Sequence, residues 1–369
     1  MHFSNFIGNA EIVHSLRQMV SENRLPQTLL FAGPRGVGKA TLARLLAAAM
    51  NCLTSPGEPC GQCSNCKRLL AADLSLDDFQ KLFAEREKMT SPQRGDSPLI
   101  VSTHPDFLIF PPDGPMQLIT IEQARQLRAA ARFGPSEGKR RIFLIDHADR
   151  ANDEAANSLL KTLEEPAPAL TLILTAENPY ELLPTIRSRS IPFYFAPLSS
   201  AEMDRFFQSR PEIPGREQSR LRGWAQGSPG RALSLHVEDY LQRRDAMLAL
   251  VKTSLGQGSF AELLAFTEAA GRRSQEKLEL QAESLTTLLD DLLHLRFGSG
   301  EALVNDDIRS ELEKIARSIP FDWFEKACGR LLELEEFRRR NIQKQLALEA
   351  LALDLRAEVR RAQPRPLRA

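Results

Sequence analysis

The sequence predicts an α/β protein, with a parallel sheet in roughly the first two hundred residues and helices in the remainder. Short apolar runs alternate with helical patterns as far as Pro197, the alternation that builds a sheet with helices on its faces. These runs are continuous rather than alternating with polar residues, which is typical of strands buried on both faces of a parallel sheet. Beyond Pro197 the runs cease, and from about Val237 only helical periodicity is left.

The predicted strands and helices follow from those runs. Five segments are predicted as strands: Thr28–Ala32, Phe107–Phe110, Ile142–Asp146, Thr171–Thr175 and Ile191–Phe195. Helices are expected over Lys39–Asn51 and Asn152–Glu165. In the second, apolar residues recur every four positions and Pro166 ends the pattern.

One segment, residues 71–103, interrupts this alternation of strands and helices. It contains an amphipathic helix candidate, followed by a polar stretch rich in turn residues. The apolar residues on one face of that helix are Leu76, Phe79, Leu82 and Phe83. We interpret it as an insertion into the α/β domain.

Composition limits the function classes. The 369 residues include 48 Lys+Arg and 48 Asp+Glu, so no global basic field indicates nucleic-acid binding, and any contact with DNA must be local or shared with partner chains. No apolar run approaches the ~20 residues of a membrane span. The first residues lack the charged and apolar regions of a secretory signal. We therefore expect a cytoplasmic protein with no membrane contact.

A glycine-rich loop predicts phosphate binding. Gly33, Gly36, Gly38 and Lys39 lie in GPRGVGK, between a predicted strand and a predicted helix. The backbone N–H groups of such a loop surround phosphates, and its lysine reaches the β- and γ-phosphates. A nucleotide with Mg²⁺ is the expected ligand.

Two departures argue against hydrolysis. The position after Lys39 should supply a hydroxyl to Mg²⁺, and here it is Ala40; Thr41 follows, but one step along a helix turns a side chain by about 100°. The strand Ile142–Asp146 ends in an acid that could hold Mg²⁺ directly or through water. His147 follows where related ATPases place a glutamate, and a neutral imidazole is a poor substitute. An ordinary surface role is the simpler interpretation of His147.

Four of the five cysteines form a cluster that predicts a structural metal site. Cys52, Cys60, Cys63 and Cys66 lie within fifteen residues, whereas Cys328 is remote. The two-residue gaps allow neighbouring thiolates to meet one tetrahedral Zn²⁺ at ~2.3 Å, and four sulfur ligands leave no open position for catalysis. An iron–sulfur cluster is the competing interpretation, and four free thiols the third.

Taken in order, the motifs resemble the AAA+ clamp-loader subunits of bacterial DNA polymerase III. The segments that carry the resemblance are Phe6–Asn9, the glycine-rich loop, the four cysteines, His104–Asp106, Ile142–Arg150, Asn157–Pro166, Ser188–Ser190, Gly227–Leu233 and Asn341–Asp354. The resemblance implies three parts: a RecA-like AAA+ P-loop domain over residues 1–197 with the zinc module at 52–66 inserted, a small all-α lid over 198–237, and an all-α collar over 238–369.

The resemblance also implies roles for single residues. Ile7 would lie near adenine, and Arg231 would touch nucleotide bound in this chain. Arg189 would be an arginine finger, offered in trans to ATP on a neighbouring subunit, with Arg187 the less favoured candidate. Ser190 stands where the family has cysteine, which leaves Arg189 in place.

The departures at Ala40 and His147 resemble the delta prime type of subunit, which does not hydrolyse ATP. The implied partners are gamma/tau-type and delta-type subunits in a hetero-pentameric ring, and through the ring the sliding clamp and primer-template DNA.

Two alternatives stay open. One is an ATP-hydrolysing gamma/tau-type motor subunit, with Thr41 or water in place of the missing ligand. The other is a zinc-containing DNA-binding protein, which neutral net charge and few aromatic residues disfavour.

Overall fold

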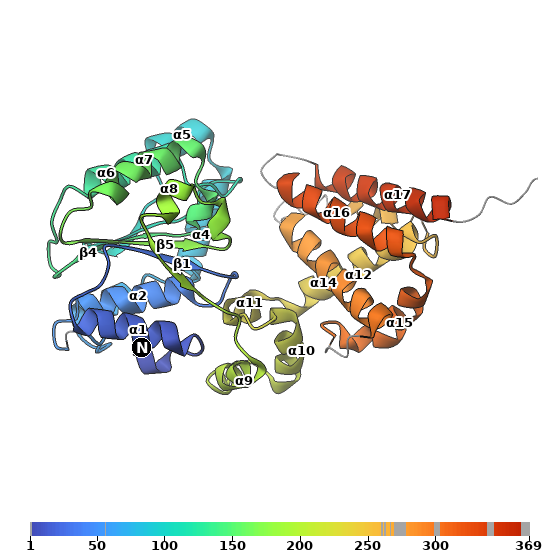
Figure 1. The fold of residues 1–369 in the computed structure, drawn as a ribbon, viewed down its shortest axis with the longest axis horizontal. Coiled ribbons are helices and arrows are strands. Elements are labelled where there is room, and N and C mark those ends of the chain that lie inside the picture. Colours follow the sequence, from blue (N-terminus) through green and yellow to red (C-terminus); the bar gives the residue numbers. More distant parts are fainter. Residues whose placement is uncertain are drawn as a thin grey trace, which may run out of the picture. The chain divides into compact units, whose positions relative to one another are not determined.

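The protein divides into two compact units. The computed structural model describes residues 2–55, 57–259, 278–298, 303–337 and 343–362, together with 261, 263–265 and 267–268. One unit comprises Met1–Ile213 and Gly227–Leu233, and the other comprises Pro214–Gln226 and Ser234–Ala369 (Figure 1). Residues of the expected lid, 198–237, are therefore shared between the two units. The division into three parts stays a prediction.

The first unit is built on a six-stranded sheet. Its strands are β1 (Thr28–Ala32), β2 (Val101–His104), β3 (Phe107–Phe110), β4 (Arg141–Ile145), β5 (Leu170–Ala176) and β6 (Ile191–Tyr194). Their order is β2-β3-β4-β5-β1-β6, and every neighbouring pair is parallel except β2 with β3. In the centre, Leu29 is in register with Ile173 of β5 and with Ile191 of β6.

All five predicted strands are confirmed, with two differences at the edges of the sheet. The sequence does not predict β2, because residues 101–103 fall in the expected insertion; β2 pairs antiparallel with β3 across a two-residue turn. β6 exists as predicted, but the expectation that it is buried on both faces was wrong. It is an edge strand, and Ile191 and Tyr194 are 48% and 64% exposed.

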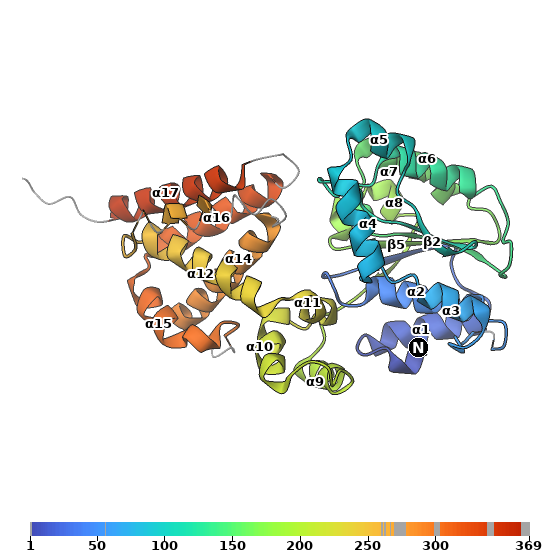
Figure 2. The same ribbon diagram turned by 180° about the vertical axis from the view of Figure 1, so that it is seen from behind.

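Helices cover both faces of the sheet. On one face, α2 (Lys39–Met50) packs with α1 (Ala10–Ser21) against alternate β1 residues such as Leu29 and Phe31. On the other face, α6 (Ile121–Ala130) and α7 (Asp153–Glu164) pack against Leu30 and Ala32. Figures 1 and 2 show α1 and α2 on one side of the sheet and α6, α7 and α8 on the other. Because helices cover both faces, every β1 side chain is buried, and this explains the continuous apolar run of β1.

Shorter elements complete the first unit: η1 (Phe3–Asn5), α3 (Ser64–Leu70), η2 (Ala148–Arg150), η3 (Pro179–Glu181), α8 (Pro184–Arg187), α9 (Ser200–Gln208) and most of α11 (Pro229–Ser234). The predicted helix over Asn152–Glu165 is confirmed as α7. Asn152 caps it, because its side-chain oxygen accepts a hydrogen bond from the backbone N–H of Ala155 at 2.8 Å.

The expected insertion forms two helices, α4 (Asp77–Lys88) and α5 (Ser91–Asp96). Phe79 and Phe83 lie half-buried against the core, as the amphipathic pattern predicted. Leu76 and Leu82, predicted on the same face, are instead 50% and 36% exposed. A buried ion pair ties α4 to the loop after β3: Arg86 Nε donates to Asp113 Oδ1 at 2.8 Å, and both side chains are at least 95% buried.

The second unit is helical throughout its described part. Its helices are α10 (Gly215–Ala225), α12 (Val237–Ser254), α14 (Leu278–Phe297), η4 (Asp306–Ile308), α15 (Arg309–Ser318), α16 (Phe321–Phe337) and α17 (Lys344–Ala362). Their core centres on the fully buried Trp323 and on leucines of α12, α14 and α17. The segment Asn341–Asp354 overlaps α17, but residues 341 and 342 lie outside the described residues, as do residues 363–369. Among the described helices, none combines the length and apolar character needed to cross a membrane.

Candidate nucleotide and metal sites

The glycine-rich loop lies between β1 and α2, as predicted. Gly33, Gly36 and Gly38 all have positive φ, and Gly36 at +76° could not carry a side chain. A Cβ there would lie 2.4 Å from Ser228 Oγ and 2.9 Å from the backbone nitrogen of Arg231. The loop therefore has the geometry of a P-loop, and the start of α11 packs directly on it.

Lys39 is the first residue of α2 and is almost fully buried. Its Nζ donates hydrogen bonds to the loop's own carbonyl oxygens, to Pro34 at 2.7 Å and also to Gly33. Burial lowers the pKa of this amine, and the nearby carboxylates of Glu177 and Asp146 oppose that effect. An anionic ligand in the loop would replace the two carbonyl groups as partners of the ammonium group.

The structure places Ala40 and Thr41 in the first turn of α2. Ala40 offers no oxygen to a metal ion. The hydroxyl of Thr41 lies 3.3 Å from Arg44 Nη2, which donates a hydrogen bond to it from the next turn of the same helix. Position 40, the usual metal-ligand position of a P-loop, therefore has no hydroxyl, and the neighbouring hydroxyl of Thr41 interacts with Arg44.

Asp146 follows β4 and is held by a residue that the sequence did not single out. Thr175, at the end of β5, donates from its hydroxyl to Asp146 Oδ1 at 2.6 Å and accepts from the backbone N–H of His147 at 2.8 Å. Because β4 and β5 are parallel neighbours, their carboxyl ends meet at the same edge of the sheet. A polar residue at the end of a predicted neighbouring strand was the signal that could have found Thr175.

His147 follows Asp146 directly, and its imidazole faces a carboxylate. It adopts the left-handed conformation, and its Nδ1 lies 3.3 Å from Glu177 Oε1. Glu177 is itself fixed, because its backbone N–H donates to Asp149 Oδ2 at 2.8 Å. The imidazole is therefore paired with a carboxylate that sequence reasoning missed.

The two remaining nucleotide-site residues lie near the P-loop segments. Ile7 is half-buried, and the ring of its neighbour Phe6 lies against Gly38. Arg231 is in α11, whose start is joined to the P-loop by two hydrogen bonds: Ser228 Oγ donates to the carbonyl of Arg35, and the Gly230 N–H donates to that of Gly36, both at 2.8 Å. The structure thus brings Arg231 beside the P-loop.

Arg189 lies away from the P-loop helix. It follows α8, on the sheet face that α7 covers, whereas α2 covers the opposite face (Figure 1). Its side chain is 36% exposed, and its Nη2 lies 2.9 Å from Glu164 Oε1. Arg187 is anchored elsewhere, with its guanidinium 5.0 Å from the centre of the Tyr180 ring.

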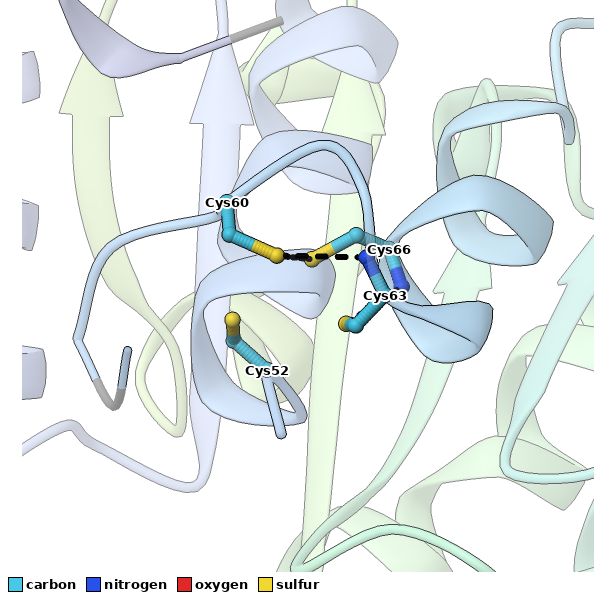
Figure 3. Close-up of side chains that lie close together, drawn as sticks. All are labelled: Cys52, Cys60, Cys63 and Cys66. Carbon is cyan, nitrogen blue, oxygen red and sulfur yellow. Dashed lines mark hydrogen bonds between the residues drawn. The ribbon is translucent and has the colours of Figure 1, made fainter. Parts of the chain in front are cut away.

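The four clustered cysteines converge as predicted. Cys52 follows α2, Cys60 and Cys63 lie in the loop before α3, and Cys66 lies in α3; all four Sγ atoms lie within 4.8 Å of one another (Figure 3). Backbone N–H groups point at the sulfurs, from Cys63 to Cys60 at 3.3 Å and from Cys66 to Cys63 at 3.4 Å. Such bonds stabilise thiolates.

The donor set fits a tetrahedral metal. The Sγ atoms of Cys60 and Cys66 are 3.8 Å apart, and a tetrahedron with Zn–S bonds of ~2.3 Å places its sulfurs about 3.8 Å apart. The Thr54 hydroxyl and backbone N–H groups lower the pKa of Cys60 to about 5, whereas burial raises that of Cys66 to about 12. A buried thiol with such a high pKa needs a cation to become a thiolate, which is the charge that a divalent metal supplies.

Together, the sheet, the P-loop between β1 and α2, and the helices on both faces define a P-loop protein of the AAA+ type with a four-cysteine cluster and a helical C-terminal region. The predicted fold class is thereby confirmed. The chain belongs to the DNA polymerase III delta subunit family: residues 8–199 match the model described as "DNA polymerase III, delta subunit", and residues 238–357 match the one for its C terminus. It is a bacterial clamp-loader subunit, as the motifs predicted.

Relatives of two kinds are similar to this chain. It is 25% identical to the DNA polymerase III subunit delta' of Bacillus subtilis over 93% of this chain and 95% of that protein. It is 30% identical to subunit delta' of Pseudomonas aeruginosa over 64% of this chain and 63% of that protein. It is also 28% identical to subunit tau/gamma of Haemophilus influenzae over 63% of this chain, but this match spans only 30% of that protein. A gamma subunit-related protein of Thermotoga maritima, a solved structure, is 14% identical over 94% of this chain and 99% of that chain, with a TM-score of 0.40.

Proposed function

We propose that this chain is a delta prime-type subunit of the clamp loader. In this role it holds a hetero-pentameric ring together with gamma/tau-type and delta-type subunits. It also offers Arg189 in trans to ATP bound on a neighbouring motor subunit. The ring then opens the sliding clamp and places it on primer-template DNA in the cytoplasm. The chain itself contributes no ATP hydrolysis.

The observation that carries the proposal is the state of the chain's own ATPase site. The P-loop backbone and Lys39 are present, but Ala40 has no ligand for Mg²⁺. His147 stands where related ATPases place a glutamate, and its Nδ1 lies 3.3 Å from Glu177 Oε1. Without a hydroxyl at position 40 and a glutamate at position 147, attacking water is poorly activated and the metal is incompletely held. Nucleotide binding through the P-loop backbone is compatible with this arrangement, and hydrolysis is not.

The surroundings of Arg189 support a role in trans. The residue lies on the opposite face of the sheet from α2, and its side chain is partly exposed. A guanidinium has a fixed positive charge and five N–H donors, which suits it to the charge that develops on a γ-phosphate. Such fingers accelerate phosphoryl transfer by ~10³-fold or more where they act.

For the metal site we propose structural Zn²⁺, held by Cys52, Cys60, Cys63 and Cys66. When bound, the ion would supply positive charge to four thiolates and join α2 to α3. The cysteines would contribute no catalytic step, because four protein ligands leave no open position.

ATP hydrolysis under single-turnover conditions, with the purified chain in excess over radiolabelled ATP, tests the proposal. Excess protein drives weak binding to completion, so a competent site cannot escape detection. We expect no hydrolysis by the isolated chain. We also expect that Arg189→Ala lowers ATP hydrolysis by the reconstituted ring, while the matched control Arg187→Ala has a smaller effect.

A motor subunit is the second candidate, and the similarity to tau/gamma subunits favours it. Clear single-turnover hydrolysis would support that candidate. Salt-dependent DNA binding by the isolated chain would instead support the third, a zinc-containing DNA-binding protein.

A further inference from the structure

The proposed finger has a fixed base. Ile186 is 1% exposed and packs in the core with Leu159 and Leu163 of α7. The Ser190 hydroxyl donates to the carbonyl of Ile186 at 2.8 Å, and the Arg189 N–H donates to the same carbonyl at 3.2 Å. The backbone on both sides of Arg189 is therefore held in place.

Two acceptors hold the guanidinium. Its Nη2 lies 2.9 Å from Glu164 Oε1, and its Nη1 donates to the carbonyl of Thr185 at 3.0 Å. Glu164 is the last residue of α7, where the partial negative charge of the helix end also attracts a cation. The guanidinium is therefore held in one place relative to α7 and α8 before any phosphate approaches.

These contacts leave N–H donors of Arg189 available for a phosphate. A guanidinium has five N–H donors; the Thr185 carbonyl occupies one of them, and Glu164 contacts a second nitrogen, Nη2. With 36% of the side chain exposed, the remaining donors can face a phosphate while Glu164 stays in contact. Glu164 is thus compatible with the bound state and does not block it.

We propose that Glu164 is a positioning residue, which orients the guanidinium of Arg189 toward ATP on the neighbouring subunit. The inference rests on the proposed function, since it needs Arg189 to act in trans. Glu164 itself touches neither nucleotide nor metal. Its effect is to reduce the conformational entropy that the long arginine side chain loses when it meets the γ-phosphate.

ATP hydrolysis by the reconstituted ring tests this. Because an ion pair between partly exposed groups is weak, Glu164→Ala should lower kcat by about two- to fivefold and leave KM for ATP unchanged. Glu164→Gln keeps an oxygen acceptor and should have an intermediate effect. The matched control is Glu165→Gln, which removes the same charge from the next, exposed residue and should have no effect.

The double variant Glu164→Ala/Arg189→Ala separates positioning from a merely structural role. If Glu164 acts through Arg189, the double variant hydrolyses ATP at the rate of Arg189→Ala alone. A further loss in the double variant, or an unchanged or raised kcat in Glu164→Ala, would overturn the positioning role while leaving the finger intact. If Arg189→Ala alone leaves hydrolysis unchanged, the proposed function fails, and this inference fails with it.

Discussion

The buried ion pair between Arg86 and Asp113 makes a strong prediction about the 71–103 segment. The pair is bidentate and both side chains are at least 95% buried, so Asp113→Asn leaves a guanidinium charge buried without its carboxylate. Breaking such a pair costs about 3–5 kcal/mol. The matched control is Asp78→Asn in the same helix, because Asp78 lies 4.0 Å from Lys81 Nζ and both side chains are mostly exposed, at 97% and 76%. That substitution should cost about 1 kcal/mol or less.

Hydrogen exchange is the appropriate assay, because the chain contains two units and global unfolding need not be two-state. A local loss of 3 kcal/mol corresponds to exchange about a hundredfold faster, since each tenfold change is worth about 1.4 kcal/mol. We expect this in the amides of α4, with the sheet little changed. The double variant Arg86→Met/Asp113→Asn should lose less than the two single variants together, because neither charge is left alone. Equal effects of Asp113→Asn and Asp78→Asn on α4 would refute the reasoning.

Three further predictions concern the metal site, the pH dependence of stability and the P-loop. Cys63→Ser should lower bound zinc, measured by atomic emission, and loosen the loop before α3 without abolishing folding. For Asp106, burial raises the pKa, but backbone N–H groups of Ser136, Gly138 and Glu137 outweigh it, so the folded-state pKa is below its usual value. Asp106→Ala should therefore cost about 2–4 kcal/mol at neutral pH, a contribution present above about pH 3.9 and lost as the pH falls through the lower folded value. Gly36→Ala should destabilise the first unit by about 1–3 kcal/mol in thermal unfolding, because alanine would be strained there.

Each of these predictions has a clear contrary outcome. Wild-type protein purified without zinc, or another bound metal, would overturn the zinc assignment. An Asp106→Ala variant whose loss of stability is equal at pH 3 and pH 7 would contradict the role of the carboxylate charge. The control for Gly36 is Gly95→Ala in α5, where a Cβ would meet nothing within 4 Å; a greater loss there than at Gly36 would contradict the strain argument.

The apolar pattern predicted the burial of a strand correctly where the strand lies inside the sheet, with a neighbouring strand on each side. The central strand β1 has helices on both faces, so its continuous apolar run has a single explanation. β6 has the same kind of run, but it forms an edge of the sheet, and Ile191 and Tyr194 are exposed. The order of strands in a sheet depends on contacts between distant segments, so hydrophobic periodicity along the chain does not predict which strand lies at an edge.

The sequence by itself determined the P-loop, the missing Mg²⁺ ligand at Ala40, and the convergence of four cysteines, because each depends on residues close together in the chain. Only the tertiary structure placed Thr175 against Asp146, Glu177 against His147, and Glu164 against Arg189. These partners lie on separate strands and helices, and the parallel sheet and its covering helices bring them together. These contacts depend on the register and packing of those elements, and local sequence patterns do not predict register or packing.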